Sequence, residues 1–338
     1  MKEEILCFYG GDKLESKGFM RGTVVMTENG PVYIENIKVG DKVLTSNNRF
    51  ETVTAVNKRQ IAGHYRLQVQ GSPATFVHGN QLFYVREKKQ KWNNELQLSE
   101  RIFSEPKWKK AKDLTKNDFI MMGKINKEKN NFEINEHDCW LLGKFLVRNY
   151  VSLKDKAITI YIEPEQKDLL EEHVKEFNHT IVKNKNVYRC IIKDERFFDL
   201  CMMSRIKKDI IIPMPLLYLP DKLQNIFLKS YSEDKGKFAD EYFILKDASN
   251  KLIYQVGIMV ANINSYGGYS LFIDGEQKIS YRIQYKDNVP KSANFVRIDN
   301  RLWQPVRQLN EIKAHRGTAY SLITESDGSF VANNLICK

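Results

Sequence analysis

The strongest constraint on the fold is that the two ends of the chain have one kind of sequence and its middle has another. From Gly22 to about Val85, short alternating runs of apolar and polar residues are separated by the turn signals ENG, VGD, SNN and QGS. The same pattern returns after Pro290, in ANFVRIDNRLWQPVRQLNEIKA and TAYSLITESDGSFVANNLIC. Such alternation between turns is typical of short strands. We therefore expect one β-rich domain that is interrupted by an insertion.

The middle of the chain alternates helices with strands. A polar run, KEKNNFEINEHD, leads into the apolar helix CWLLGKFLVRNY, for which Asp138 is the expected N-cap. A strand (AITIYIEP) follows, and further helix patterns are EQKDLLEEHVKEFN, ERFFDLCMMSRI, IPMPLLYLPDKLQNIFLKSYSEDKG and SNKLIYQVGIMVANI. The order helix, strands, helix occurs twice, which predicts a mixed α/β unit built from a weak internal repeat.

The charge balance favours a polyanionic partner. The chain has 53 basic and 42 acidic residues, a net charge of +11. In a folded protein such an excess favours nucleic acid, and the alternative is a surface of solvated lysines.

The cysteines and the apolar runs bear on the compartment. The five cysteines, Cys7, Cys139, Cys190, Cys201 and Cys337, form no CxxC pair, so we expect a reducing intracellular compartment, cytoplasm or nucleus. No apolar run approaches the length of a membrane span, and the N-terminus lacks a signal-peptide core. We expect no membrane association. We also expect the protein to be a monomer.

Three segments at the two ends resemble the conserved blocks of inteins and related Hint proteins. GFMRGTVVMTENGPVYIENIKVGDKVLT is similar to the opening block, in which a cysteine or serine precedes Phe or Leu, two variable residues and Gly-Thr. HGNQLFYV is similar to the second block, and TAYSLITESDGSFVANNLICK to the closing blocks. The resemblance implies an all-β, horseshoe-like splicing domain.

The middle resembles a two-motif LAGLIDADG homing endonuclease. LLGKFLVRNY and LPDKLQNIFLKSYSEDKG stand where its two motif helices are expected. The implied fold is α+β, a Hint domain interrupted by an α/β two-repeat endonuclease domain. The domain prediction is a leader or N-extein segment at residues 1–17, Hint parts at 18–125 and 293–338, and an endonuclease-like domain at 126–292.

The resemblance also shows which chemical groups are replaced in the opening block. The first residue of an intein attacks the preceding carbonyl, which requires a thiol or hydroxyl. Gly18 stands at that position and has neither. One subclass lacks the first nucleophile and uses a residue after the intein instead.

The second block, Thr-x-x-His, fits the sequence in two registers. One places His78 at the threonine and Gln81 at the histidine, and a glutamine cannot transfer a proton. The other takes Thr75 to His78 as the motif, which keeps both residue types but displaces the following strand by three residues. We favour the first register, in which His78 is foremost a polar turn residue.

The closing blocks and the motif helices have also lost reactive residues. Gly328 stands where a histidine precedes the Phe, and Lys338 stands at the penultimate histidine. The acidic residues that end the two motif helices and bind a divalent metal are matched by Arg148, followed by Asn149, and by Lys235. Cationic side chains repel a metal, but Glu233 or Asp234 could supply the second site by a one-residue shift, whereas nothing replaces the acid of the first.

These replacements leave three hypotheses open. The first is an intein-like protein impaired in splicing and cleavage that retains binding of double-stranded DNA, with Lys154, Lys156, Lys237 and Lys246 as candidate contacts. The second is an active homing endonuclease that uses Glu233 or Asp234. The third is an intein that splices without the first nucleophile. Splicing requires no cofactor, Mg²⁺ is expected only for an active endonuclease, and host-protein exteins are partners if the chain is embedded in a host.

Overall fold

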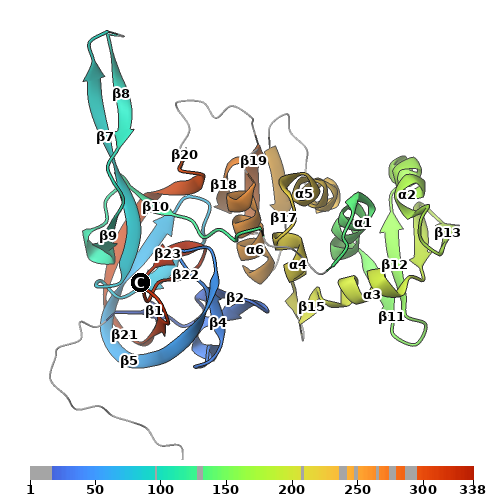
Figure 1. Cartoon of the computed structure of the whole chain (residues 1–338), viewed down its shortest axis with the longest axis horizontal. Helices are drawn as coiled ribbons and strands as arrows, with labels where there is room; N and C mark the ends of the chain where they lie inside the picture. Colours follow the sequence, from blue (N-terminus) through green and yellow to red (C-terminus); the bar gives the residue numbers. More distant parts are fainter. Residues whose placement is uncertain are drawn as a thin grey trace, which may run out of the picture.

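The computed structural model describes residues 17–95, 97–127, 132–206, 209–235, 242–246, 250–263, 266–273, 279–285 and 295–338. Figure 1 shows a β-rich part formed by both ends of the chain and a mixed part formed by its middle. This confirms the fold class expected from the sequence. No helix among the described residues is long and apolar enough to cross a membrane.

The β-rich part is one sheet of 14 strands with both ends of the chain interleaved. Along its main path the order is β1-β6-β5-β4-β2-β22-β23-β7-β10-β21-β20, and β3, β8 and β9 pair at its side. Its strands from the first part of the chain are β1 (Phe19–Met20), β2 (Val24–Thr27), β3 (Gly30–Tyr33), β4 (Lys42–Leu44), β5 (Phe50–Val69), β6 (Thr75–Val77), β7 (Leu82–Asn93), β8 (Leu98–Phe103), β9 (Lys107–Lys110) and β10 (Asp118–Met121). Those from the end of the chain are β20 (Val296–Ile298), β21 (Arg301–Thr324), β22 (Phe330–Ala332) and β23 (Leu335–Cys337).

Two long strands form the frame of this sheet. β5 and β21 pair antiparallel from Val69 and Val306 to Val53 and Thr324, and Figure 1 shows them curving together around the β-rich part. Register shifts interrupt the pairing at three places, and extra residues of this kind bend a strand. Two short 3-10 turns, η1 (Ile34–Asn36) and η2 (Ala111–Asp113), complete this part.

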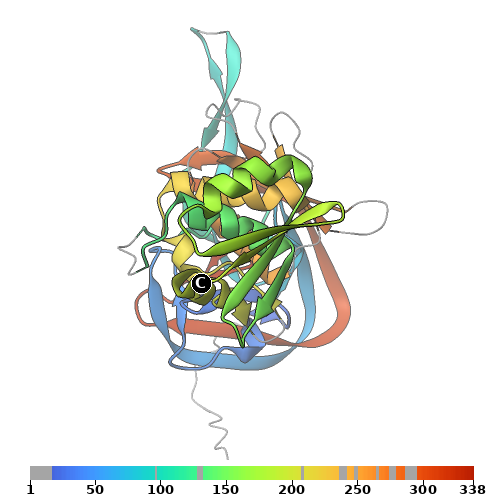
Figure 2. The ribbon, with the colours of Figure 1, turned by 90° about the vertical axis from the view of Figure 1, so that its right-hand side faces the viewer.

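The first half of the insert is a four-stranded sheet with helices packed on it, and Figure 2 views the molecule from this end. Its strand order is β11-β12-β14-β13. The elements are α1 (Glu136–Val147), β11 (Asn149–Ser152), β12 (Ala157–Ile162), η3 (Pro164–Gln166), α2 (Lys167–Val174), β13 (His179–Asn184), β14 (Val187–Ile192) and α3 (Glu195–Met202).

Two sequence expectations for these helices are wrong in detail. The N-cap of α1 is Asn135, and Asp138 is the third helical residue of a capping box, in which each side chain bonds the backbone amide of the other residue. The carboxylate of Asp138 also accepts hydrogen bonds from Nη1 and Nη2 of Arg196, at 2.8 and 2.7 Å. The pattern ERFFDLCMMSRI is not helical to its end, because α3 stops at Met202 and β15 (Arg205–Ile206) follows.

The second half of the insert repeats the helix and strand pattern. After β16 (Asp209–Ile210) come α4 (Met214–Leu217), α5 (Asp221–Lys235), β17 (Tyr242–Lys246), α6 (Asn250–Asn262), β18 (Tyr266–Ile273) and β19 (Ile279–Tyr285). The three strands form a sheet in the order β17-β19-β18. The expected single helix from Ile212 is divided into α4 and α5, and Pro220 stands directly before α5. Gly236, its expected end, lies outside the described residues.

Helices α1 and α5 pack closely at the centre of the insert. A β-carbon on Gly143 would lie 2.8 Å from the Cβ and Oγ of Ser230, so only glycine fits on α1 at this crossing. The Ser230 hydroxyl donates to the carbonyl of Trp140 at 2.6 Å. Gly143 and Ser230 occupy equivalent places in the two motif segments, and the two repeats therefore meet through their motif helices.

Buried polar contacts join the insert to the β-rich part. Arg297, on β20, donates to the carbonyls of Val260 and Ile263 at 2.8 Å, at the end of α6. Its burial lowers the pKa of the guanidinium to about 10. In the segment that leads from β10 into the insert, the Ile125 amide donates to Oδ1 of Asn262 at 2.9 Å. Carbonyls that end a helix need donors, and the β-rich part supplies them.

Candidate functional site

Three buried phenylalanines bring the matched splicing positions together. Phe19 follows Gly18, Phe83 lies two residues after Gln81, and Phe330 lies two residues after Gly328. The ring of Phe19 lies 5.9 Å from that of Phe83 and 5.7 Å from that of Phe330, both edge-on, and all three are at most 1% exposed. Each buried ring contributes about 2–3 kcal/mol to folding, so the three chain segments are held by the core itself.

Gly18 sits where a side chain would collide with the sheet. Its φ is +138°, a conformation that favours glycine. A β-carbon there would lie 2.6 Å from the carbonyl oxygen of Tyr320, on the long strand β21. The Gly18 carbonyl accepts the backbone amide of His78 at 2.9 Å. At the residue that the resemblance matches to the first nucleophile, the backbone therefore leaves no room for a side chain.

Gln81, Lys338 and Gly328 converge on one another. Nε2 of Gln81, which is fully buried, donates to the carbonyl of Lys338 at 2.9 Å. A β-carbon on Gly328 would lie 3.8 Å from Cε of Lys338. Oε1 of Gln81 is buried and has no hydrogen-bond partner among the described residues. An amide is held here where the resemblance implies a histidine, and it can bond the last carbonyl but cannot transfer a proton.

The centre of the insert contains a buried cation. The side chain of Lys144, on α1, is fully buried, and its Nζ lies 2.9 Å from Oε2 of Glu233 on α5 and 3.2 Å from Oε1 of Gln166. It also lies 5.1 Å from the centre of the Trp140 ring. The carboxylate of Glu233 is one-third exposed and is neutralised by this lysine. The two motif helices are thus joined by an ion pair between Lys144 and Glu233.

The residues at the ends of the motif helices are bound to the protein itself. Arg148 is the C-cap of α1 and donates to Oε1 of Glu163 at 2.7 Å. Asn149 donates to the carbonyl of Phe145 and accepts from Arg205. Asp234 and Lys235 form the last residues of α5, and only their backbone is described. Of the predicted metal positions, the structure therefore gives side-chain geometry for Glu233 alone.

Comparison with known proteins assigns a family to the first part of the chain. Residues 17–79 match the family model of the Hint domain. This segment of the chain is similar to a Hint domain. A comparison with curated proteins gives no match. The Hint-domain match agrees with the resemblance of the opening block to Hint proteins, and it does not extend to the insert.

Several solved structures are similar to parts of the chain. A bacterial intein-like domain from Clostridium thermocellum is 24% identical, covers 32% of this chain and 67% of its own, and has a TM-score of 0.25. I-DmoI, in a complex with DNA and Mn, is 15% identical over 44% of this chain and 89% of its own, with a TM-score of 0.32. A splice-inactive variant of the AceL NrdHF class 3 split intein is 20% identical over 36% and 70%, with a TM-score of 0.24.

The two registers of the second block differ in their surroundings within the Hint domain. Thr75 is 1% exposed, and its hydroxyl accepts Nδ2 of Asn333 at 3.0 Å, so it is used in the core. Gln81, by contrast, contacts the carbonyl of Lys338. This geometry favours the register that places His78 at the threonine and Gln81 at the histidine.

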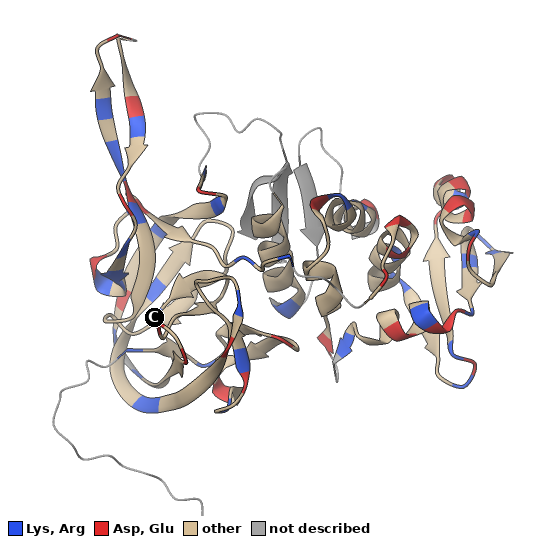
Figure 3. Cartoon of the chain, in the orientation of Figure 1, with Lys and Arg blue, Asp and Glu red and all other residues tan. Residues whose placement is uncertain are grey.

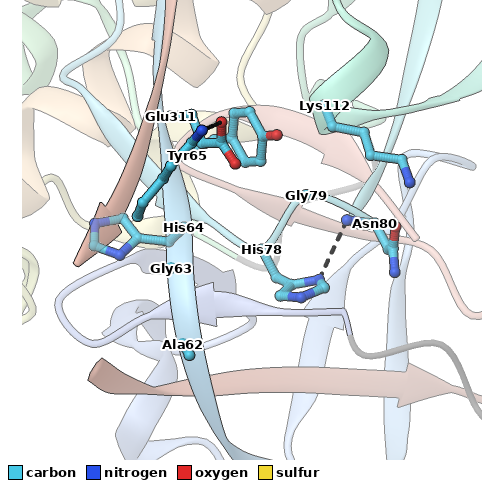
Figure 4. Close-up of a pocket in the computed structure, with 10 residues that line it drawn as sticks. Ala62, Gly63, His64, Tyr65, His78, Gly79, Asn80, Lys112 and Glu311 are labelled. Carbon is cyan, nitrogen blue, oxygen red and sulfur yellow. Dashed lines mark hydrogen bonds and ion pairs between the residues drawn. The ribbon is translucent and has the colours of Figure 1, made fainter. Parts of the chain in front are cut away.

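His78, whose backbone amide bonds the Gly18 carbonyl, also lines a pocket, which Figure 4 shows. The pocket has a volume of about 280 Å³ and is also lined by His64, Tyr65, Lys112 and Glu311. Nδ1 of His78 accepts the backbone amide of Asn80 at 3.2 Å, so the ring closes the turn, as expected for a polar turn residue. Burial is the largest cause that raises the pKa of Tyr65, and the charge of Glu311 adds to it.

The described cysteines are unreactive. Cys337 is fully buried, its thiol donates to the carbonyl of Phe330 at 3.2 Å, and burial raises its pKa well above the usual value. Cys139, Cys190 and Cys201 are also free and buried. Because the nucleophile is the thiolate, a buried thiol with a raised pKa does not replace the missing first nucleophile.

The residues of the insert centre do not fit a catalytic divalent metal. Mg²⁺ requires several oxygen ligands, and this centre places the amine of Lys144 against its one described carboxylate. No group of three or more His, Cys, Asp or Glu with metal-binding geometry occurs among the described residues. We therefore derive no step that passes through a metal.

Two of the four lysines predicted to contact DNA have described side chains, and both lie in one turn. Lys154 is exposed in the turn between β11 and β12, and Lys156 in the same turn is paired with Glu195. Lys246 lies on β17, where only the backbone is described, and Lys237 lies outside the described residues.

Sequence reasoning missed the lysine that fills the insert centre. Lys144 lies inside the quoted motif LLGKFLVRNY, four residues before the expected acid, but its pairing with Glu233 joins segments 89 residues apart. A lysine in an otherwise apolar helix run was the available signal. Its partner could not be identified without the packing of α1 on α5.

Proposed function

We propose that this protein is an intein-like protein that binds double-stranded DNA and is impaired in both splicing and DNA cleavage. The proposal rests on a retained Hint scaffold in which the reactive positions carry other groups. A reducing intracellular compartment belongs to the same proposal, because the described cysteines are free.

The observation that carries the proposal is the packing of Gly18. Splicing in the standard order begins with a side-chain nucleophile at this position. Here the backbone has a positive φ, and a β-carbon would lie 2.6 Å from the Tyr320 oxygen. A cysteine at residue 18 would require the strand pairing of β1 with β21 to shift. The backbone around residue 18 is therefore packed in a way that only glycine fits.

The insert supports the second part of the proposal. Metal-dependent cleavage needs carboxylates that are free to bind a cation near a scissile phosphate. Glu233 is held by Lys144 instead, and Arg148 adds a further cation at the end of α1. The guanidinium of Arg148 is exposed, and a cation at this helix end favours contact with a phosphate backbone. The net charge of +11 acts in the same direction.

The test combines processing and binding. The chain is expressed between its natural flanking sequences, and the products are analysed by intact mass. The purified protein is also incubated with Mg²⁺ and a plasmid library of genomic fragments, and its affinity for duplex DNA is measured across a salt series. We expect one unprocessed mass, intact plasmids, and binding that weakens steeply with salt. Ligated flanks, cut plasmids or no binding at low salt would contradict the corresponding part.

A further inference from the structure

A second cavity in the Hint domain is surrounded by positive charge. It lies at the base of the hairpin formed by β7 and β8, which projects from the domain (Figure 3), and has a volume of about 310 Å³. Its floor is apolar, formed by Phe119, Pro305 and Val306. Its charged lining residues are Lys88, Arg101, Lys116 and Arg307, and no acidic residue is among the described residues that line it.

The four cations come from four separate segments that the fold holds together. Lys88 is on β7 and Arg101 on β8, which pair along the hairpin. Lys116 is in the turn before β10, and this turn is fixed because the Lys88 amide donates to the carbonyl of Asn117 at 2.7 Å. Arg307 is on β21 and is bonded to Gln70. The cluster is therefore a consequence of the tertiary fold, not of a lysine-rich stretch.

Asp118, which precedes the lining residue Phe119 in sequence, is used elsewhere. Asp118 is fully buried, and its carboxylate accepts Nζ of Lys109 at 2.8 Å and the Thr115 amide at 2.6 Å. The guanidinium of Arg101 lies 5.6 Å from the centre of the Phe103 ring, and that ring packs edge-on against Phe119 at 5.0 Å. Aromatic packing thus fixes both the floor and one wall.

We propose that this cavity, named here the hairpin-base cavity, binds a phosphate group. Lysine and arginine side chains that converge on a concave, partly apolar site repel one another, and a phosphate oxyanion relieves this repulsion while accepting their hydrogen bonds. The phosphate belongs either to a nucleic-acid backbone or to a small free phosphate. The first source rests on the proposed DNA binding, whereas the second is independent of it.

The test compares two charge-matched double variants of the full chain. K88Q/R101Q removes two cations from the hairpin-base cavity. K89Q/K91Q removes two exposed lysines from the same hairpin outside the cavity. The probes are inorganic pyrophosphate, measured by titration calorimetry at low salt, and a fluorescent 20-base-pair duplex, measured by anisotropy from 50 to 200 mM salt. Thermal unfolding establishes that both variants are folded.

We expect K88Q/R101Q to weaken binding of at least one probe about tenfold or more and K89Q/K91Q to weaken it at most about twofold. If the source is a backbone, the slope of log affinity against log salt for the duplex falls by about 2 in the cavity variant. If the parent chain binds pyrophosphate but no duplex, and K88Q/R101Q abolishes the pyrophosphate binding, the phosphate site is supported and the proposed DNA binding is contradicted.

Three results would overturn the proposed phosphate site. One is an equal loss in both variants, which indicates diffuse charge on the hairpin. Another is that the parent chain does not bind pyrophosphate and that K88Q/R101Q binds the duplex as tightly as the parent does. The proposed DNA binding would then stand, but it would not involve the cavity. The third is the failure of both probes to bind the parent chain at low salt.

Discussion

A β-carbon on Gly18 would lie 2.6 Å from the carbonyl oxygen of Tyr320, well inside any contact that a folded backbone tolerates. The two residues belong to β-strand segments that are about 300 positions apart in the chain and pair antiparallel next to Gly18, where Phe19 faces Tyr320. The position that begins splicing in relatives of the Hint domain is therefore closed by the long strand β21.

This contact predicts a specific loss of stability. Gly18→Ala should lower the free energy of unfolding by about 3 kcal/mol or more, because it adds both a strained positive φ and a collision. Gly22→Ala is the matched control, since Gly22 also has a positive φ, +86°, but open space around its β-carbon. It should cost about 1 kcal/mol. Equal losses in denaturant unfolding would show that the collision with Tyr320 is not real.

The ion pair between Lys144 and Glu233 predicts an asymmetric mutant cycle. Glu233→Gln removes the described carboxylate that pairs with the fully buried ammonium of Lys144, which still contacts Gln166 and the Trp140 ring, and should cost about 3 kcal/mol. Lys144→Met leaves a carboxylate that water can reach, and should cost less. The double variant should be more stable than the sum of the two losses implies. Urea unfolding of the four proteins measures this, and simple additivity would mean that the two side chains act independently.

A histidine pair in the insert predicts a pH dependence. His173 stacks on Trp140 at 4.5 Å, and its Nδ1 lies 3.1 Å from Nδ1 of His137. Burial, and then the charge of His137, lower the pKa of His173 to about 4. The unfolded chain therefore binds a proton more readily than the folded one between about pH 6.5 and 4, so stability falls as the pH falls through this window.

After allowance for solvent screening, the loss assigned to His173 from pH 7 to 5 is about 1 kcal/mol. His173→Gln should be less stable at pH 7, because the stacking on Trp140 is lost, but its stability should decline less over this interval. Denaturant unfolding at matched ionic strength measures both slopes. Parallel declines in parent and variant would show that the titration of His173 contributes nothing.

The cationic ends of the motif helices predict indifference to Mg²⁺. Adding 10 mM MgCl₂ to the parent should change the Tm by no more than a salt control of equal ionic strength. In Arg148→Asp combined with Lys235→Asp, two carboxylates return to these positions, and Mg²⁺ should raise the Tm relative to the same control. A specific rise in the parent would point to a metal site that includes Glu233 or Asp234.

The fold could be predicted from the sequence because its signals are local or follow family blocks. Alternation with turn residues marks the strands of the Hint domain, and the block from Gly18 to Thr45 falls within its matched region, residues 17–79. The start of α1 was misjudged by three residues, because Asn135 and Asp138 cap one another and either suits an N-cap. Helix ends depend on such side-chain choices.

The sites were less predictable, because they depend on contacts between distant segments. The three phenylalanines that follow Gly18, Gln81 and Gly328 are unremarkable strand residues until the sheet joins them. The hairpin-base cavity requires four segments to meet, and none of its cations was a candidate DNA contact. Of those candidates, Lys156 is paired with Glu195, which a sequence pattern cannot reveal.

The most direct test of retained architecture without splicing chemistry is the intact mass of the protein expressed between its natural flanking sequences. The packing of Gly18 against Tyr320 predicts one mass, that of the uncut precursor, before and after prolonged incubation under reducing conditions. A second species with the mass of the two flanks joined to each other would contradict it.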